Sequence, residues 1–162
     1  MTAIDIGAPA IYQQYGYGPD ATLISEHNPA NLSGKITSVD IFAYAGWPLT
    51  EAVVGTFYTT NGNTLKCRDS AYIGDVPAGS MQTFPGLDIT VEAGDYIGIY
   101  FLTGHSYIAI SGGDGAWDVD GEHIDPGDEA SYLHHANWLM SLYGRGEEVG
   151  VVVGRSFGYI MG

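Results

Sequence analysis

The sequence predicts an all-β fold, a single antiparallel β-sandwich with long loops and little or no helix. Two runs that suit strands, VVGTFYTT and NTLKCR, meet at Asn61-Gly62, a dipeptide typical of a tight hairpin turn. The same rhythm, a short apolar or alternating run followed by Gly, Pro, Asn or Asp, continues toward the C-terminus. No window shows apolar residues recurring every three or four positions, the pattern of an amphipathic helix.

The first half of the chain begins with an N-terminal arm rich in Tyr, Gly and Pro over residues 1–20, which we expect to be loosely structured. A short apolar run at residues 21–25 suits an edge strand. Residues 35–45, KITSVDIFAYA, place alternate aliphatic side chains on one face and therefore predict a half-buried strand. The hairpin of residues 53–68 follows.

The second half contains the strand that we expect to be central. Residues 96–102, YIGIYFL, are apolar on both faces, as in a strand covered from two sides. Gly98 inside this run predicts either a bulge or a bulky neighbour lying across the backbone. A long acidic loop at residues 112–130 and a C-terminal strand segment at residues 147–162 complete the expected order.

Length and composition favour one domain. The 162 residues are 45% hydrophobic, enough for one core, and no linker or change of composition marks a second domain, so we expect residues 1–162 to form a single unit. The 24 glycines suit many tight turns, and the 12 tyrosines suit strands whose faces carry flat, amphipathic side chains.

The charge excludes several partners. A net charge of −14 repels phosphate backbones and anionic membrane surfaces, so the sequence predicts neither nucleic-acid binding nor membrane insertion. The N-terminal sequence, MTAIDIGAPA, carries no basic and apolar leader. We expect either synthesis in the cytoplasm, with release to a virion or extracellular surface, or a leader that has been removed.

The acidic loop carries a candidate cofactor site. Carboxylates interspersed with glycine are the ligand chemistry of Ca²⁺, and the fragment DVDGE resembles part of a helix-loop-helix calcium loop. The glycine position, the spacing to the last acid and the flanking helices of that motif are missing. Two interpretations stay open, a calcium site and a solvated acidic loop. The candidate ligands are Asp114, Asp118, Asp120, Glu122, Asp125, Asp128 and Glu129.

Aromatic residues outside the expected strands are the candidate contact residues. Large rings in loops favour contact with sugar faces or with a neighbouring protein, because they bury much area at little entropic cost. The alternative is that they fold back and cap the ends of the sandwich. They are Tyr12, Tyr15 and Tyr17 in the arm, and Trp47 and Trp117 in loops.

Catalytic residues are not expected. Cys67 is the only cysteine, and its surroundings predict a free, buried thiol rather than an activated nucleophile. No nucleophile elbow, phosphate-binding glycine loop or dinucleotide fingerprint occurs, and no pair of acids stands out from the 19 present. The sequence therefore predicts a protein that is not an enzyme.

Several segments resemble a group of β-sandwich sequences from environmental DNA that come from viruses of microbes or from their hosts. They span most of residues 4–143 and are GAPAIYQQY, NPANLSGKITSVDIFA, FYTTNGNTLKCRDS, IGDVPAGSMQTFPGLDITVEAGDYIGIYF and IDPGDEASY. No activity is assigned in that group, so the resemblance carries over no site residues. The run VEAGDYIGI is also similar to a penultimate-strand pattern of jelly-roll modules in virion surfaces and carbohydrate-binding domains, which implies a jelly-roll-like sandwich.

Three functions follow as hypotheses. The first is a structural or surface-display module that self-associates into a homo-oligomer or particle, as a virion or extracellular assembly component. The second is a carbohydrate-binding jelly-roll module with calcium in the acidic loop. The third is a glycan-active hydrolase.

Overall fold

The computed structural model describes residues 3–148, and these residues form strands and no helix. The all-β prediction is confirmed. No segment of the described chain is a helix that could cross a membrane. The predicted C-terminal strand segment lies outside the described residues except for its first two, which end β14. The strands are β1 Ala3–Ala8, β2 Tyr15–Tyr17, β3 Ala21–Ser25, β4 Gly34–Phe42, β5 Leu49–Asn61, β6 Thr64–Val76, β7 Met81–Val91, β8 Tyr96–Phe101, β9 Ser106–Ala109, β10 Ala116–Asp120, β11 Glu129–Ser131, β12 Leu133–His135, β13 Leu139–Met140 and β14 Leu142–Glu148.

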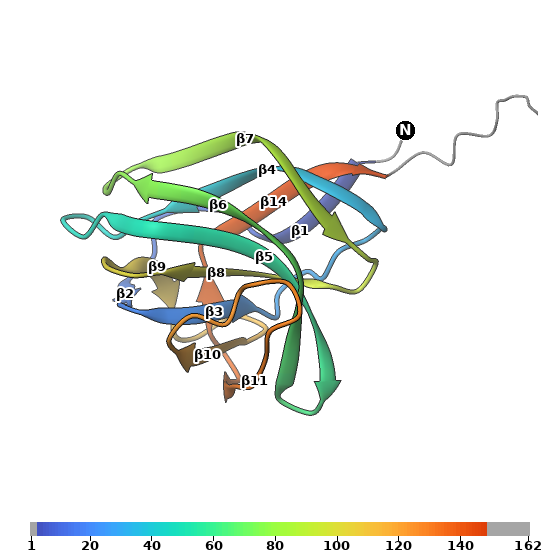
Figure 1. The fold of residues 1–162 in the computed structure, drawn as a ribbon. Coiled ribbons are helices and arrows are strands. Elements are labelled where there is room, and N and C mark those ends of the chain that lie inside the picture. Colours follow the sequence, from blue (N-terminus) through green and yellow to red (C-terminus); the bar gives the residue numbers. More distant parts are fainter. Residues whose placement is uncertain (1–2, 149–162) are drawn as a thin grey trace, which may run out of the picture.

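The strands form two packed layers and a small third sheet. A four-stranded sheet of order β1-β14-β4-β7 lies over a seven-stranded sheet of order β11-β6-β5-β8-β3-β10-β12 (Figure 1). The third sheet has the order β13-β9-β2. All pairings between these strands are antiparallel. Aliphatic side chains from both large sheets, such as Ile6, Ile36 and Ile97, fill the space between the layers. This arrangement is the predicted sandwich.

The hairpin that the sequence indicates is formed by β5 and β6. Asn61 pairs with Thr64 across the turn, and Gly62 has a φ of 63°, in the left-handed region that glycine adopts without strain. Both strands are longer than the predicted runs, at 13 residues each. The register shifts at several points between them, so bulges allow this long hairpin to bend with its sheet.

The predicted central strand is β8, which pairs with β5 on one side and β3 on the other. All its residues from Ile97 onward are buried. A Cβ built on Gly98 would lie 2.6 Å from a ring carbon of Phe57 and 2.8 Å from the carbonyl oxygen of Leu23. The glycine is therefore required by a bulky neighbour across the backbone, the second of the two predicted reasons.

The structure differs from the expected arm at residues 1–20. Residues 3–8 form β1, an edge strand of the four-stranded sheet, which pairs with β14. Ile4 and Ile6 are fully buried there. The alternation in AIDIGA is short and is followed by many Gly and Pro residues, so the local signal is weak, and pairing with a strand more than 130 positions away decides the conformation.

The expected acidic loop at residues 112–130 contains a strand. Residues 116–120 form β10, which lies between β3 and β12 in the seven-stranded sheet. Trp117 is part of this strand and is only 4% exposed, so the prediction that it lies in a loop is wrong. Its indole packs among buried residues that include Ile24 and Phe57. These apolar neighbours come from other strands, whereas the residues next to Trp117 in the sequence include several acids and suggest an exposed loop.

Candidate functional site

Six aromatic and imidazole side chains gather where the four-stranded and three-stranded sheets meet, and we call this surface the aromatic end. Tyr107 is at its centre and is almost fully buried. Its ring centroid lies 5.1 Å from that of Tyr12, 4.9 Å from that of Phe42 and 4.8 Å from that of Tyr44. The members come from the segment after β1, the end of β4, the β4–β5 connection, the β8–β9 connection and β9. They are Tyr12, Phe42, Tyr44, Trp47, His105 and Tyr107.

Backbone hydrogen bonds fix the β4–β5 connection in this surface. The Tyr44 amide donates to the His105 carbonyl at 2.8 Å, and the Trp47 amide donates to the Tyr44 carbonyl at 2.8 Å. The Ala45 amide donates to the Tyr107 hydroxyl at 3.3 Å. The chain is thus held in a closed turn that presents the Trp47 ring outward, where it is 52% exposed. Gly46 allows this turn, because its φ of 86° lies in the left-handed region that glycine adopts without strain.

A pocket of about 520 Å³ lies beside Trp47. The Trp47 and His105 ring centroids are 4.5 Å apart, and both residues line the pocket. The hydroxyl oxygens of Thr50 and Thr103, also in its lining, are 2.6 Å apart. The pocket therefore offers a flat exposed ring beside hydroxyl groups and carries no acid.

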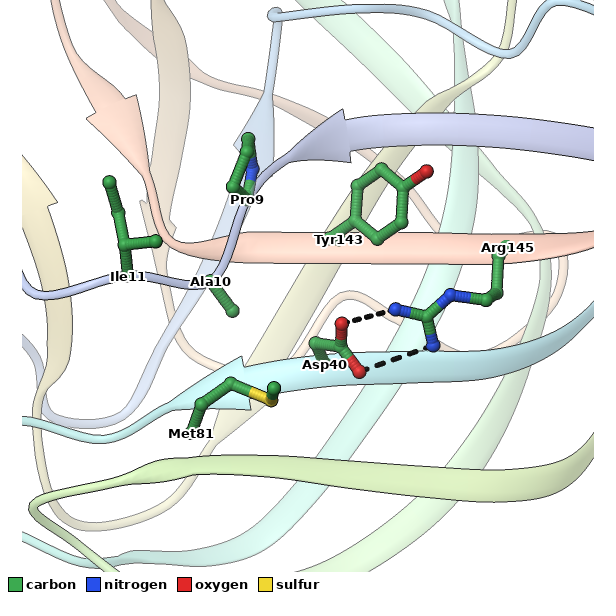
Figure 2. Close-up of a pocket in the computed structure, with 7 residues that line it drawn as sticks. All are labelled: Pro9, Ala10, Ile11, Asp40, Met81, Tyr143 and Arg145. Atoms are coloured by element: carbon green, nitrogen blue, oxygen red, sulfur yellow. Dashed lines mark hydrogen bonds and ion pairs between the residues drawn. The ribbon is translucent and has the colours of Figure 1, made fainter.

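A second pocket, of about 290 Å³, lies next to the aromatic end, because its lining includes Ile11, which precedes Tyr12, and Met81, which pairs with Phe42. Figure 2 shows the side chains around it, from residues 9–11 after β1, Asp40 of β4, Met81 of β7, and Tyr143 and Arg145 of β14. The Arg145 guanidinium faces the Asp40 carboxylate and is paired with it through both terminal nitrogens. The hydrogen bond with Asp40 raises the pKa of Arg145. Arg145 is already neutralised and therefore does not present a free charge to an anion.

The aromatic end and its two pockets are electrically neutral. Asp40 and Arg145 are the only acid and the only strong base that line the pockets, and they form one ion pair. Yet the chain as a whole carries a net charge of −14. The negative charge of the described residues therefore lies elsewhere on the surface.

The structure separates the predicted aromatic contact residues into three groups. Tyr12 and Trp47 belong to the aromatic end and are strongly exposed. Tyr15 is exposed on β2, which pairs with β9. Tyr17 is half-buried and Trp117 is buried: the Tyr17 hydroxyl donates to Asp118 at 3.0 Å, and the Trp117 indole N–H donates to Asn63 at 3.0 Å. Only Tyr12, Tyr15 and Trp47 therefore remain candidates for contact with another molecule.

Only three of the seven predicted calcium ligands come together. Glu122, Asp125 and Asp128 place carboxylate oxygens within 4.8 Å of one another. Asp114 is paired with His27 at 2.7 Å, and Glu129 accepts a hydrogen bond from Thr60 at 2.5 Å. Asp118 is buried beneath Tyr17 and His135, and Asp120 is at the end of β10 outside the cluster.

Two histidine–carboxylate pairs connect residues 114–135 to the residues that follow β3, and a third pair joins β12 to β10. They are His27 with Asp114, His134 with Glu26, and His135 with Asp118. The His135 ring is also stacked on Trp138, with centroids 3.6 Å apart. In the described part of the chain, no Ser, Thr or Cys side chain is hydrogen-bonded to a histidine ring. The pairs hold the rings in place through carboxylate oxygens.

Cys67 is a free thiol that faces the interior, as predicted. Its Sγ donates to the Ile124 carbonyl at 3.3 Å. Burial, followed by the charges of Asp128, Asp69 and Asp125, raises the pKa of the thiol to about 12. Because the thiolate is the nucleophilic form, Cys67 is inert near neutral pH.

The fold defines the class of this protein as an antiparallel β-sandwich, and comparison adds no closer assignment. Comparison with protein-family models, with curated proteins and with solved structures gave no match. The function must therefore be argued from the surface itself.

Proposed function

We propose that this protein is a non-catalytic structural module that self-associates through the aromatic end. The observation that carries the proposal is an exposed, neutral, aromatic-rich surface on a chain with a net charge of −14. Aromatic residues and Met are enriched at protein–protein interfaces, and charged residues are depleted at their centres. Display in a virion or an extracellular assembly is part of the proposal, since negative charge elsewhere keeps particles soluble.

The distribution of charge supports contact at this surface rather than elsewhere. Two copies of an acidic chain repel one another, and the repulsion is weakest where the approaching surfaces carry no net charge. Ile11, Tyr12 and Met81 project there with about half or more of each residue exposed. Covering these side chains removes apolar area from water at a small entropic cost for the ring.

Removing the two most exposed of these side chains is expected to weaken self-association. The double variant Ile11→Ser and Tyr12→Ser should raise the dissociation constant at least about tenfold, a loss of about 1.4 kcal/mol. Light scattering after size exclusion, over a range of protein concentrations, measures the effect. Raising the salt concentration should strengthen association of the unaltered protein, because screening reduces the repulsion between acidic copies.

Leu133→Ser is the matched control. Leu133 is 64% exposed, close to the 70% of Tyr12, but lies on β12 and lines neither pocket. Its substitution should leave association unchanged. The proposal is wrong if the unaltered protein is monomeric at every concentration, or if the control weakens association as much as the double variant does.

The pocket beside Trp47 favours a second candidate function, binding of a neutral glycan. An exposed flat ring next to Thr50, Thr103 and His105 combines a stacking surface with hydroxyl and imidazole groups that hydrogen-bond sugars. A neutral ligand is not repelled by the acidic chain. We propose this ligand class as the alternative occupant of the aromatic end.

Replacing Trp47 by alanine is expected to reduce glycan binding at least about tenfold, because the stacking surface is lost. Binding is measured on an array of neutral glycans and by co-sedimentation with insoluble polysaccharides, with and without chelator. Tyr12→Ser, at a residue that does not line this pocket, should bind as the unaltered protein does. No binding across the array would remove the glycan candidate and leave self-association untouched.

A further inference from the structure

The two edges of the four-stranded sheet differ. β1 forms one edge and β7 forms the other (Figure 1). Along β1, the side-chain amide of Asn31 accepts from the Asp5 amide at 2.9 Å and donates to the Ala3 carbonyl at 3.1 Å. Asn28 covers the next part, because its carbonyl accepts from the Gly7 amide at 3.0 Å and its side chain donates to the Gly7 carbonyl at 3.1 Å. The β1 edge is therefore already occupied by the chain's own residues.

The β7 edge is closed in the same way only toward its C-terminal end. The Thr90 amide donates to the Asp69 carboxylate at 2.7 Å, and the Thr90 carbonyl accepts from the Thr56 hydroxyl at 2.7 Å. Residues 81–87, MQTFPGL, carry no charge, although charged side chains are a common protection of an exposed edge. Within residues 3–148, their backbone is hydrogen-bonded to no segment other than β4. The first half of β7 is thus the open edge of this sheet.

Pro85 determines which backbone groups this open edge presents. Pro85 is opposite Ser38 of β4 but has no N–H, so this pair is not of the hydrogen-bonded kind, and the Pro85 carbonyl points away from β4. Residues 81–85 pair with β4 without a register shift, and backbone groups alternate in direction along a strand. The outward groups are therefore an N–H and a carbonyl at Met81, the same two groups at Thr83, and a carbonyl alone at Pro85.

This set of groups is complementary to itself. When two copies pair antiparallel with their Thr83 residues opposite one another, the two Thr83 residues exchange N–H···O=C hydrogen bonds. Each Met81 amide then faces the Pro85 carbonyl of the second copy, so every outward N–H of residues 81–85 has an acceptor. The same register pairs two threonines and places Met81 against Pro85, both of which are favourable cross-strand contacts.

The side chains around the open edge allow a second acidic chain to approach. Asp40, which is opposite Thr83 in β4, is paired with Arg145, and Asp88, which follows the open run, is paired with Lys35. The edge is therefore locally neutral on a chain with a net charge of −14, and repulsion between copies is weak there.

Strand pairing also covers apolar surface. Met81 is 46% exposed, and Phe84 is only half-buried where it packs against the core cluster. A strand added to β7 lies beside both side chains and removes part of each from water.

We propose that two copies of this protein join through residues 81–85 of β7, paired antiparallel about a two-fold axis at Thr83. The pairing makes one continuous sheet from the two four-stranded sheets. The inference rests on the proposed self-association and gives it a geometry, since Met81 also lines the pocket next to the aromatic end. Because the β1 edge is occupied, the joined sheet does not extend by strand pairing at its outer ends, and this contact by itself produces a closed dimer.

Cysteine cross-linking tests the position of the axis. Opposite residues of a hydrogen-bonded antiparallel pair have Cα atoms about 5.5 Å apart, within the range of about 4.4–6.8 Å that a disulfide spans. Thr83→Cys should therefore give a disulfide-linked dimer under mild oxidation, measured by non-reducing electrophoresis and mass spectrometry. Met81→Cys is the matched control, because this position is also exposed but lies about 14 Å from its copy along the paired strands. It should remain largely unlinked, and the native Cys67 is buried.

Thr83→Pro tests the hydrogen bonds at the axis. The substitution removes an N–H that points outward, as proline does at position 85, so the protein should still fold. Its dissociation constant should rise at least about tenfold, measured by light scattering, because both hydrogen bonds donated at the axis are lost. Thr83→Ala loses the same hydroxyl, which donates to Asp40 at 2.8 Å, but keeps the N–H and should associate as the unaltered protein does. Should Thr83→Pro fail to fold, the cross-linking pattern decides.

Three results would overturn the strand pairing: no cross-link in Thr83→Cys, equal cross-linking in Met81→Cys, or a folded Thr83→Pro that associates as tightly as Thr83→Ala. The first is expected if residues 149–162 or an extended segment of another protein occupies this edge instead. If Ile11→Ser and Tyr12→Ser together still weaken association, the aromatic end remains the contact and only the strand pairing is wrong. A protein that is monomeric at every concentration removes both proposals.

Discussion

Replacing Gly98 by valine is expected to destabilise the protein more than any surface change. The new Cβ would lie 2.6 Å from the Phe57 ring and 2.8 Å from the backbone oxygen of Leu23. The backbone contact cannot be relieved by a rotamer change, because β8 is hydrogen-bonded between β3 and β5. We expect a loss of at least about 4 kcal/mol, a large part of the stability of a typical domain, and a melting temperature at least about 10 °C lower. Thermal unfolding followed by circular dichroism measures both.

Gly62→Ala separates this steric effect from the general effect of replacing a glycine. Gly62 has a φ of 63°, and a Cβ there meets no atom within 4 Å. The only cost is the left-handed conformation of a non-glycine residue, about 1–2 kcal/mol. An equal or smaller loss of stability for Gly98→Val than for Gly62→Ala would contradict the close packing of Phe57 across Gly98.

Removing the Asp95 carboxylate is the second large effect. Asp95 is only 2% exposed, and Arg68 donates to it from Nε at 2.6 Å and from Nη2 at 3.0 Å. The same carboxylate accepts from the Glu92 amide at 2.9 Å and so also holds the β7–β8 turn. Asp95→Ala leaves Nε and Nη2 of Arg68 and this amide without their acceptor, and we expect a cost of about 3–5 kcal/mol. Urea unfolding measures the loss.

Glu92→Ala removes the other, exposed carboxylate that contacts Arg68 and serves as the control. The Glu92 side chain is 61% exposed and accepts from Arg68 at 3.0 Å. Exposed ion pairs contribute about 0–1 kcal/mol, so this variant should unfold close to the unaltered protein. Equal losses in the two variants would contradict the view that burial, rather than pairing alone, makes the Asp95 contact important.

The candidate site was predictable only in part. Tyr12 and Trp47 stand out in the sequence because they are large rings among turn-forming residues, and both are exposed in the structure. Trp117 has the same kind of surroundings in the sequence but is buried on β10. The difference arises because β3 and β12 flank β10, and no local signal indicates those neighbours. The role of Tyr107 at the centre of the aromatic end was likewise missed, since its partners Tyr12 and Tyr44 are far away in the chain.

The sequence by itself determined the all-β class and the Asn61-Gly62 hairpin. These features depend on turn chemistry and on period-two alternation, which act over a few residues. Tertiary structure alone decided that residues 3–8 join a sheet, that Glu26 contacts His134 across 108 positions, and that three of seven acids meet. Such contacts form only when distant strands pair, and their partners are set by the order of strands in the sheets, which local patterns do not encode.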